Sequence, residues 1–120
     1  MKKILNEAEF DVKNECPVKH AHQFISGKWR IGILWSLRNE ARRFGQLKRD
    51  VPGISEKMLI QELKHLQSLD VIRRKAYNEL PPRVEYRLAK RGESLIPLIE
   101  NVIGWSLSDI KSNQASSVKK

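Results

Sequence analysis

Apolar and polar positions follow two different periods along this chain. Before residue 70 and after residue 92, apolar residues return every three or four positions, which is the spacing of helices with one buried face. Residues 83–88 instead alternate with a period of two, and a second β-prone stretch begins at Val71-Ile72 on the other side of the Pro81-Pro82 turn, as in a hairpin. The pattern therefore predicts a mainly α-helical chain with one small β-hairpin.

Residues that favour helix ends set the predicted boundaries. Pro17 suits the first turn of a helix, where its missing N–H costs nothing, so Cys16 is the predicted N-cap. Ser26 and Gly27 end this helix, and Ser55 is the N-cap of a later one. The predicted helices cover residues 17–25, 28–38, 45–50, 55–69 and 93–112, with a short extended piece at 43–44.

The apolar stripes of these helices are the predicted core. In the helix over 55–69, Leu59, Leu63 and Leu66 fall on one face. The corresponding positions of the first two helices are Val18, Ala21, Phe24, Ile25, Trp29, Ile33, Leu34 and Leu37. The aromatic residues Phe44, Trp35, Tyr86 and Trp105 also occupy core-like positions.

Two of the predicted helices have the spacing of a helix-turn-helix. The tight turn Val51-Pro52-Gly53 joins the helix over 45–50 to the helix over 55–69. A hairpin alone is marginal in water, so the hairpin after the second helix must pack on the helices. A hairpin in that position is a wing, and the predicted fold is a winged helix-turn-helix.

The chain has the length of a single domain. Residues 15–112 are predicted to form it, after an N-terminal arm of residues 1–14 and before a disordered tail of residues 113–120, which is poor in apolar surface. The chain has one cysteine, no apolar run of membrane-spanning length, and polar Asn6 and Glu7 where a secretory signal would need an apolar core. We therefore expect a cytoplasmic protein.

Positive charge narrows the choice of partner. The net charge is +9, and residues 73–91 carry seven Lys or Arg against two Glu. Such an excess suits a polyanion, with nucleic acid first and an anionic membrane surface second, although solubility alone is a simpler explanation. The position of the charges decides between these interpretations.

The polar face of the helix over 55–69 has the residues of a recognition helix. Lys57, Gln61, Lys64 and Ser68 lie opposite the leucine stripe, flanked by Met58 and His65. Lys binds guanine edges or phosphates, Gln binds adenine, and apolar groups contact the thymine methyl. A merely solvated face is the alternative. The predicted DNA contacts from this helix are Ser55, Lys57, Met58, Gln61, Lys64 and His65.

The wing and the helix-turn-helix supply further predicted contacts. Pro81 and Pro82 stiffen the wing tip, residues 78–83, because they cannot donate to a strand ladder. Arg83 and Lys75 can then reach a phosphate or the adjoining minor groove, where negative potential attracts arginine. The predicted phosphate contacts are Arg87, Lys90 and Arg91 on the wing side, and Arg42, Arg43 and Lys48 on the helix-turn-helix side.

These motifs resemble those of a known family. The run CPV…GKW…LR…RFGQL…PGISEKML…LK.L…VIRR..Y.E.PPRVEYRL...G, over roughly residues 16–107, is similar to the HxlR-type winged-helix transcription regulators, relatives of the MarR regulators. The resemblance implies a homodimeric, DNA-binding repressor or activator acting on a palindromic operator. In that family, threonine is usual at the positions of Ile60 and Ala89, and Gly-Leu is common at the start of the strand, where this chain has Val71. These differences leave the preferred DNA bases open.

The last helix points to a dimer independently of the resemblance. Its apolar residues cover more of its circumference than one core stripe needs. They are Leu95, Ile96, Leu98, Ile99, Val102, Ile103, Trp105 and Leu107. A two-fold dimer would hold two recognition helices about 34 Å apart, and a thick intramolecular core is the alternative.

Cys16 is a candidate thiol sensor. At an N-cap its sulfur faces unpaired N–H groups and the positive end of the helix dipole, with Lys19 and His20 nearby, which favours the thiolate. The resemblance adds that a cysteine at this pre-proline position senses thiol-reactive signals in several members. An inert cap is the alternative. A metal site of Cys16, His20 and His22 is disfavoured, because His22 points elsewhere and a fourth ligand is lacking.

Other functions have less support in the sequence. The motifs of phosphate-binding loops and nucleophile elbows are absent, so we expect neither an enzyme nor a cofactor. The competing hypothesis is a basic adaptor that binds nucleic acid nonspecifically or binds a partner protein. RNA-binding modules usually display stacking aromatics, whereas those of this chain are predicted to be buried.

Overall fold

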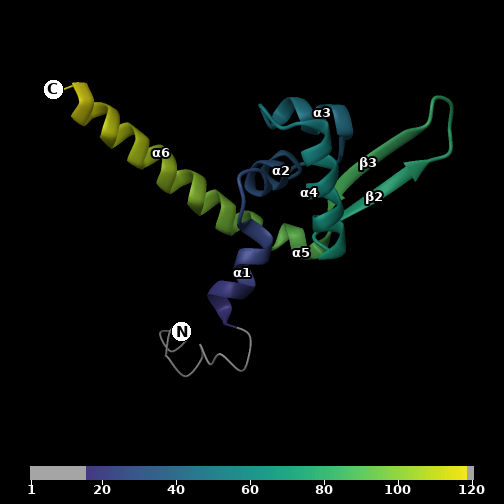
Figure 1. Ribbon diagram of the computed structural model, residues 1–120, viewed down its shortest axis with the longest axis horizontal. Helices are drawn as coiled ribbons and strands as arrows, with labels where there is room; N and C mark the ends of the chain where they lie inside the picture. The colour runs from purple at the N-terminus through teal and green to yellow at the C-terminus, as the bar shows by residue number, and fades with distance from the viewer. Residues whose placement is uncertain (1–15, 119–120) are drawn as a thin grey trace.

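The computed structural model describes residues 16–118 and has the predicted order of elements. Within this range, four helices precede a hairpin and further helix follows it (Figure 1). The predicted N-terminal arm, residues 1–14, lies outside the described residues. The elements are α1 (Pro17–Ile25), α2 (Arg30–Ser36), β1 (Arg42–Arg43), α3 (Phe44–Asp50), α4 (Glu56–Ser68), β2 (Ile72–Tyr77), β3 (Arg83–Leu88), α5 (Lys90–Glu93) and α6 (Ile96–Val118).

The strands form a three-stranded antiparallel sheet in the order β1-β3-β2. The register pairs Ile72 with Leu88 and Arg74 with Tyr86. Because paired residues share a face and successive residues alternate, the hairpin has two chemically different faces. The apolar face carries Ile72, Arg74, Ala76, Val84, Tyr86 and Leu88, and the basic face carries Arg73, Lys75, Tyr77, Arg83, Glu85 and Arg87. The predicted alternation in the second strand is confirmed.

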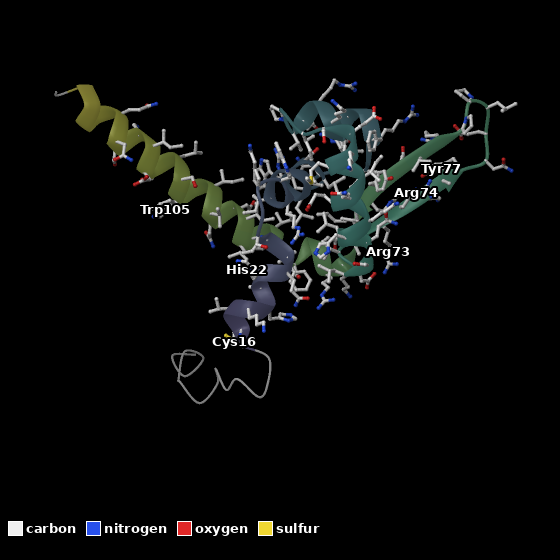
Figure 2. The ribbon with its side chains drawn as sticks, in the orientation of Figure 1. Cys16, His22, Arg73, Arg74, Tyr77 and Trp105 are labelled. Carbon is white, nitrogen blue, oxygen red and sulfur yellow. The ribbon has the colours of Figure 1, made fainter. Side chains whose placement is uncertain are left out.

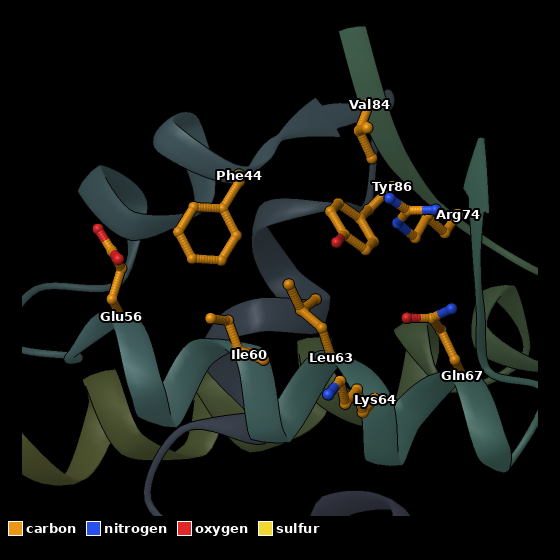
Figure 3. A pocket seen from close by; sticks show the side chains of 9 residues that line it. All are labelled: Phe44, Glu56, Ile60, Leu63, Lys64, Gln67, Arg74, Val84 and Tyr86. Carbon is orange, nitrogen blue, oxygen red and sulfur yellow. The ribbon is translucent and has the colours of Figure 1, made fainter. Parts of the chain in front are cut away.

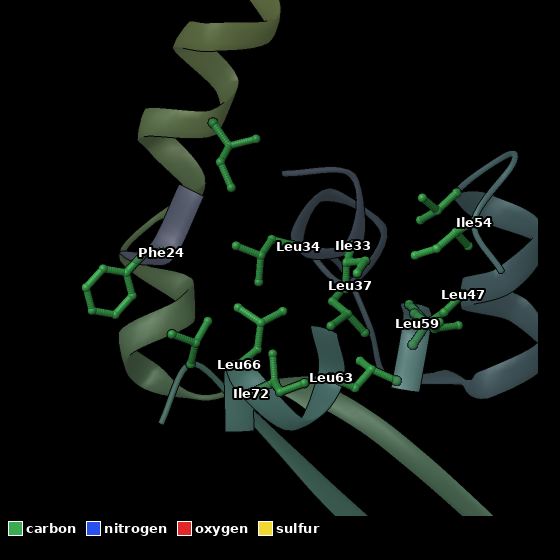
Figure 4. Close-up of a cluster of buried hydrophobic side chains, with 13 residues drawn as sticks. Phe24, Ile33, Leu34, Leu37, Leu47, Ile54, Leu59, Leu63, Leu66 and Ile72 are labelled. Atoms are coloured by element: carbon green, nitrogen blue, oxygen red, sulfur yellow. The ribbon is translucent and has the colours of Figure 1, made fainter. Parts of the chain in front are cut away.

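The core lies where α2, α3 and α4 meet the base of the sheet (Figure 4). The predicted stripe of α4 is confirmed, since Leu59, Leu63 and Leu66 are all buried. Burial of each such side chain contributes roughly 1.5–3 kcal/mol to folding. The buried cluster comprises Phe24, Ile33, Leu34, Leu37, Leu47, Val51, Ile54, Leu59, Leu63, Leu66, Val71, Ile72 and Ile99.

Two residues predicted for the core lie on the surface. Val18 is 66% exposed and Trp105 is 69% exposed. Each belongs to the part of its helix that extends beyond the globule, α1 at its start and α6 past its first turns (Figures 1 and 2). The prediction of a buried position was wrong for both, because helical periodicity identifies an apolar face but not whether this chain covers it.

The turn of the helix-turn-helix requires its glycine. Gly53 has a φ of 87°, a left-handed conformation that side chains with a Cβ rarely adopt. Pro52 precedes it, and the chain then returns to extended backbone at Ser55, the N-cap of α4. The hydroxyl of Ser55 accepts a hydrogen bond from the backbone N–H of Met58 at 3.0 Å, as predicted for an N-cap.

Loss of this cap gives a first testable expectation. The Ser55→Ala variant should lose about 1 kcal/mol of unfolding free energy, because the N–H of Met58 loses its partner at the helix start. Urea denaturation monitored by circular dichroism measures the loss, with Ser68→Ala at the other end of α4 as the matched control. The Ser68 hydroxyl donates to the His65 carbonyl on the exposed surface. An equal loss in both variants would contradict a capping role for Ser55.

The helical region after the wing is divided, where the sequence predicted one helix. α5 ends at Glu93, and α6 begins at Ile96. Pro97 explains the break, because proline lacks an N–H and clashes with the carbonyl four residues earlier unless it stands in a first helical turn.

α6 is longer than predicted and leaves the globule. It continues to Val118, beyond the predicted end at residue 112, so the segment expected to be a disordered tail is helical as far as residue 118. Between Gly104 and Val118 the chain has neither proline nor glycine to end the helix. Within residues 16–118, each helix is too short or too polar to cross a bilayer.

Candidate nucleic-acid interface

Three polar side chains of α4 point away from the core, as predicted. Lys57, Gln61 and Lys64 are all exposed. They lie opposite the buried leucines, which hold α4 against the core and so fix which face is presented. The arrangement has the donors and acceptors that base edges and phosphates require.

The structure places the other predicted residues of α4 differently. Met58 is half-buried and packs against the hydrophobic cluster, and the Ser55 hydroxyl is used as the helix cap. His65 is half-buried, with its Nε2 3.2 Å from the carbonyl oxygen of Gln23 in α1. The structure does not bring these three side chains together with Lys57 and Gln61 on the outward face.

An ion pair that is mostly shielded from solvent anchors α4 from behind. Arg30 of α2 donates from Nε to Glu62 Oε1 at 2.7 Å, and both side chains are less than one-fifth exposed. Arg30 Nη1 also donates to the Gln23 carbonyl at 3.0 Å, the same oxygen that His65 approaches. α1, α2 and α4 are therefore joined by one polar cluster behind the outward face of α4.

The basic face of the wing is organised around Tyr77. The guanidinium of Arg83 lies 3.7 Å from the centre of the Tyr77 ring, and the Lys75 ammonium lies 4.8 Å from it. Arg83 also donates to Glu85 at 3.0 Å, and its Nε lies 3.4 Å from Glu79. Arg83 is only 25% exposed, so in this conformation it braces the wing, whereas Lys75 and Arg87 are exposed.

The three residues predicted on the helix-turn-helix side also differ in their surroundings. Arg42 donates to the Ser36 carbonyl at 3.1 Å and lies 3.8 Å from Asp50 and 3.5 Å from Glu40. Arg43 and Lys48 are exposed, and neither has an ion pair with the residues that the structure describes. Arg42 therefore secures the loop between α2 and β1, while Arg43 and Lys48 remain available to a partner.

One cation beside α4 was not among the predicted site residues. Arg74 is exposed and shares the apolar face of the hairpin with Val84 and Tyr86, where it lines a groove with Lys64. Pairing of the two strands could have identified Arg74, because a residue opposite Tyr86 lies on the same face of the hairpin as Tyr86. Counting charges along residues 73–75 does not reveal this difference, since Arg73 and Lys75 lie on the basic face.

Cys16 lies at the far end of α1, away from the wing (Figure 2). It is the N-cap of α1, as predicted, and it is partly exposed. Its carbonyl accepts the first helical hydrogen bond, from the His20 N–H at 2.8 Å. Cys16 is therefore a partly exposed residue at a helix N-terminus, on the same helix whose other end joins the cluster behind α4.

Comparisons with known proteins agree with this geometry. The chain is 40% identical over 93 residues to the HTH-type transcriptional regulator YkvN of Bacillus subtilis, covering 78% of this chain and 79% of that protein. A crystal structure assigned to the MarR family of transcriptional regulators, from Porphyromonas gingivalis W83, superposes with a TM-score of 0.75 at 45% identity, over 78% of this chain and 92% of that one.

A solved structure described as the redox regulator HypR in its oxidized form is also similar. Its TM-score is 0.75 at 31% identity, over 78% of this chain and 96% of that one. The family model described as HxlR-like helix-turn-helix matches residues 24–114, which include α2, α3, α4 and the wing. This chain therefore belongs to the HxlR-like helix-turn-helix family, whose relatives are DNA-binding transcription regulators.

Proposed function

We propose that the chain is a homodimeric transcription regulator that binds a palindromic operator in the cytoplasm. The observation that carries this proposal is the outward face of α4, where Lys57, Gln61 and Lys64 are exposed beside a wing with a basic face. In this reading α4 enters the major groove and the wing tip, residues 78–83, follows the flanking backbone and minor groove. Lys75 and Arg87 then contact phosphates.

The exposed apolar side chains of α6 support the dimer. Four large apolar side chains of α6 are exposed, on a helix that extends away from its own globule (Figure 1). They are Leu98, Trp105, Leu107 and Ile110. Exposed apolar side chains clustered along one helix mark an interaction site, and a second copy of α6 offers the same side chains in return.

Cys16 is the proposed point of control. Its partial exposure at the start of α1 supports reaction with oxidants or electrophiles, and the similarity to a redox regulator agrees with this role. As Cys16 is the chain's one cysteine, oxidation would give a sulfenic acid, a mixed disulfide with a small thiol, or a bridge between subunits. Each product alters the start of α1, whose other end contacts Arg30 and His65.

Selection of bound duplexes from a random DNA pool, with and without diamide, tests both parts of the proposal. We expect enrichment of a palindrome with half-sites about one helical turn apart, and loss of that enrichment in diamide. The Cys16→Ser variant should select the same palindrome in both conditions. Enrichment that ignores diamide in the native chain would contradict the thiol switch and leave the regulator intact.

Substitutions in α4 distinguish sequence-specific recognition of DNA from nonspecific electrostatic binding. Lys57→Gln should weaken operator binding roughly tenfold, because a contact to a base edge or phosphate is worth about 1–3 kcal/mol. Lys111→Gln, which removes the same charge from the exposed far part of α6, is the control and should bind normally. Equal losses of binding in the two variants, with no DNA sequence enriched in the selection, would contradict a sequence-specific regulator. They would favour the nonspecific adaptor instead.

A further inference from the structure

Ile60 differs from the other apolar residues of α4. The leucines of the α4 stripe are buried, and Met58 packs against the same cluster, so their apolar surface stabilises the fold. Ile60 is 42% exposed and lies outside the buried cluster. Within α4, all of which the structure describes, Ile60 is therefore the apolar side chain that the fold leaves largely uncovered.

Ile60 lies beside the polar side chains of α4 that are available to DNA. The residues three before and four after a helical position are its neighbours on the helix surface, and for Ile60 these are Lys57 and Lys64, both exposed. Gln61 follows it directly and is exposed as well. Figure 3 shows Ile60 on the edge of α4 that faces Phe44, at the side of an open groove between α4 and the wing. An apolar group that approaches α4 from outside can therefore reach Ile60.

Neither packing nor helix formation accounts for isoleucine at this position. A β-branched side chain loses χ1 freedom in a helix, so isoleucine is a weaker helix former than glutamine or lysine. A single exposed apolar residue is common on protein surfaces. What distinguishes Ile60 is its place between two exposed lysines and next to an exposed amide, on the helix that the fold presents outward.

We propose that Ile60 is a specificity-determining residue, which contacts the C5-methyl group of a thymine in the operator half-site. The N-terminal residues of a recognition helix contact base edges in the major groove, and Ile60 is the fifth residue of α4. The thymine methyl is the apolar group that the major groove offers, and side chains recognise it by apolar contact. The inference rests on the proposed function, because that function places α4 in the major groove.

The other bases fit this side chain less well. Cytosine has a hydrogen where thymine has the methyl group, and adenine and guanine present an N7 acceptor at the same edge. A phosphate is charged and hydrated, so it gains nothing from an apolar neighbour. We therefore expect thymine at one fixed position of each half-site, close to the base pair that Gln61 contacts.

Deoxyuridine tests this contact directly, because it differs from thymidine only in lacking the C5-methyl group. When the thymines of the selected operator are replaced one at a time, binding by the native chain should weaken about fourfold at one position of each half-site, as expected for one methyl group removed from an apolar contact. In Ile60→Ala the same replacement should have little effect, because the partner of the methyl group is already gone. Such non-additivity identifies two groups in contact.

A matched variant separates this contact from a general effect of truncation. Val18→Ala shortens another exposed β-branched side chain, at the start of α1 and away from the wing, and should keep the fourfold loss with deoxyuridine (Figure 1). Ile60→Ala should remain folded, since Ile60 lies outside the buried cluster and alanine favours the helix. Thermal denaturation of both variants checks this.

Two results would overturn the role of Ile60: no thymine whose replacement weakens binding by the native chain, or a loss of the same size in Ile60→Ala. Either result, obtained on an enriched palindrome, leaves the regulator intact. If the selection from random DNA enriches no sequence, the proposed function fails, and recognition of thymine by Ile60 fails with it. The selection therefore shows which of the two proposals is wrong.

Discussion

The Leu66→Ala variant should lose about 3–4 kcal/mol of unfolding free energy. Leu66 is fully buried in α4, within the cluster shown in Figure 4. Truncation removes its apolar contacts and leaves a cavity that close-packed neighbours fill only in part, and such substitutions cost about 2.7–5 kcal/mol. Because α4 carries the outward residues, the folded variant should also bind operator less well.

Denaturant unfolding at a fixed protein concentration measures this loss, since the proposed dimerisation would make apparent stability depend on concentration. Leu80→Ala is the matched control. Leu80 is 96% exposed at the wing tip, so the same truncation there should change stability by less than about 0.5 kcal/mol. Similar losses in the two variants would mean that Leu66 is not packed as described.

Gly92→Ala should be nearly as damaging, at about 3 kcal/mol, although it adds only one methyl group. Gly92 is buried in α5, and a Cβ there would collide with the backbone carbonyl oxygen of Val71. That oxygen already accepts a hydrogen bond from the Ala89 N–H at 2.8 Å. This bond joins the residue after β3 to the residue before β2 at the base of the wing. Overpacking against backbone forces both segments apart and costs about 1–3 kcal/mol or more.

Gly32→Ala provides the opposite outcome from the same chemical change. A Cβ at Gly32, in α2, would meet only the Val51 side chain at ordinary contact distances of 3.7 and 3.8 Å. Alanine should therefore stabilise the protein by about 0.5–1 kcal/mol, because it favours the helix over the unfolded chain. Thermal unfolding of the two variants measures the contrast, and stabilisation by Gly92→Ala would refute the close approach to Val71.

Local sequence patterns predicted the elements and the buried side of α4. The spacing of Leu59, Leu63 and Leu66, the cap at Ser55 and the alternation around Tyr86 all depend on residues near one another in the chain. The break before α6 also had a local signal in Pro97, which the apolar periodicity of the surrounding residues concealed.

Side-chain partners distant in sequence could not be predicted in the same way. His65 lies next to the carbonyl of Gln23, 42 positions away, and Arg30 pairs with Glu62, 32 positions away. The spacing of polar residues along a helix is the same whether they contact DNA or another helix. For the same reason, the apolar pattern of α6 did not show which of its residues the globule covers, and Trp105 is 69% exposed in the part of the chain that the structure describes.

The carboxylates in and beside the wing should affect how strongly DNA binding depends on ionic strength. A cation that binds DNA steepens the loss of affinity with salt, because the phosphate it neutralises releases a condensed counterion. Arg83 is already paired with Glu79 and Glu85, and Arg73 with Asp70, so neither acts as a bare charge. Fewer counterions are then released than the cations of the hairpin suggest. Under the proposed function, we therefore expect the affinity for DNA to fall less steeply with salt than the number of hairpin cations suggests.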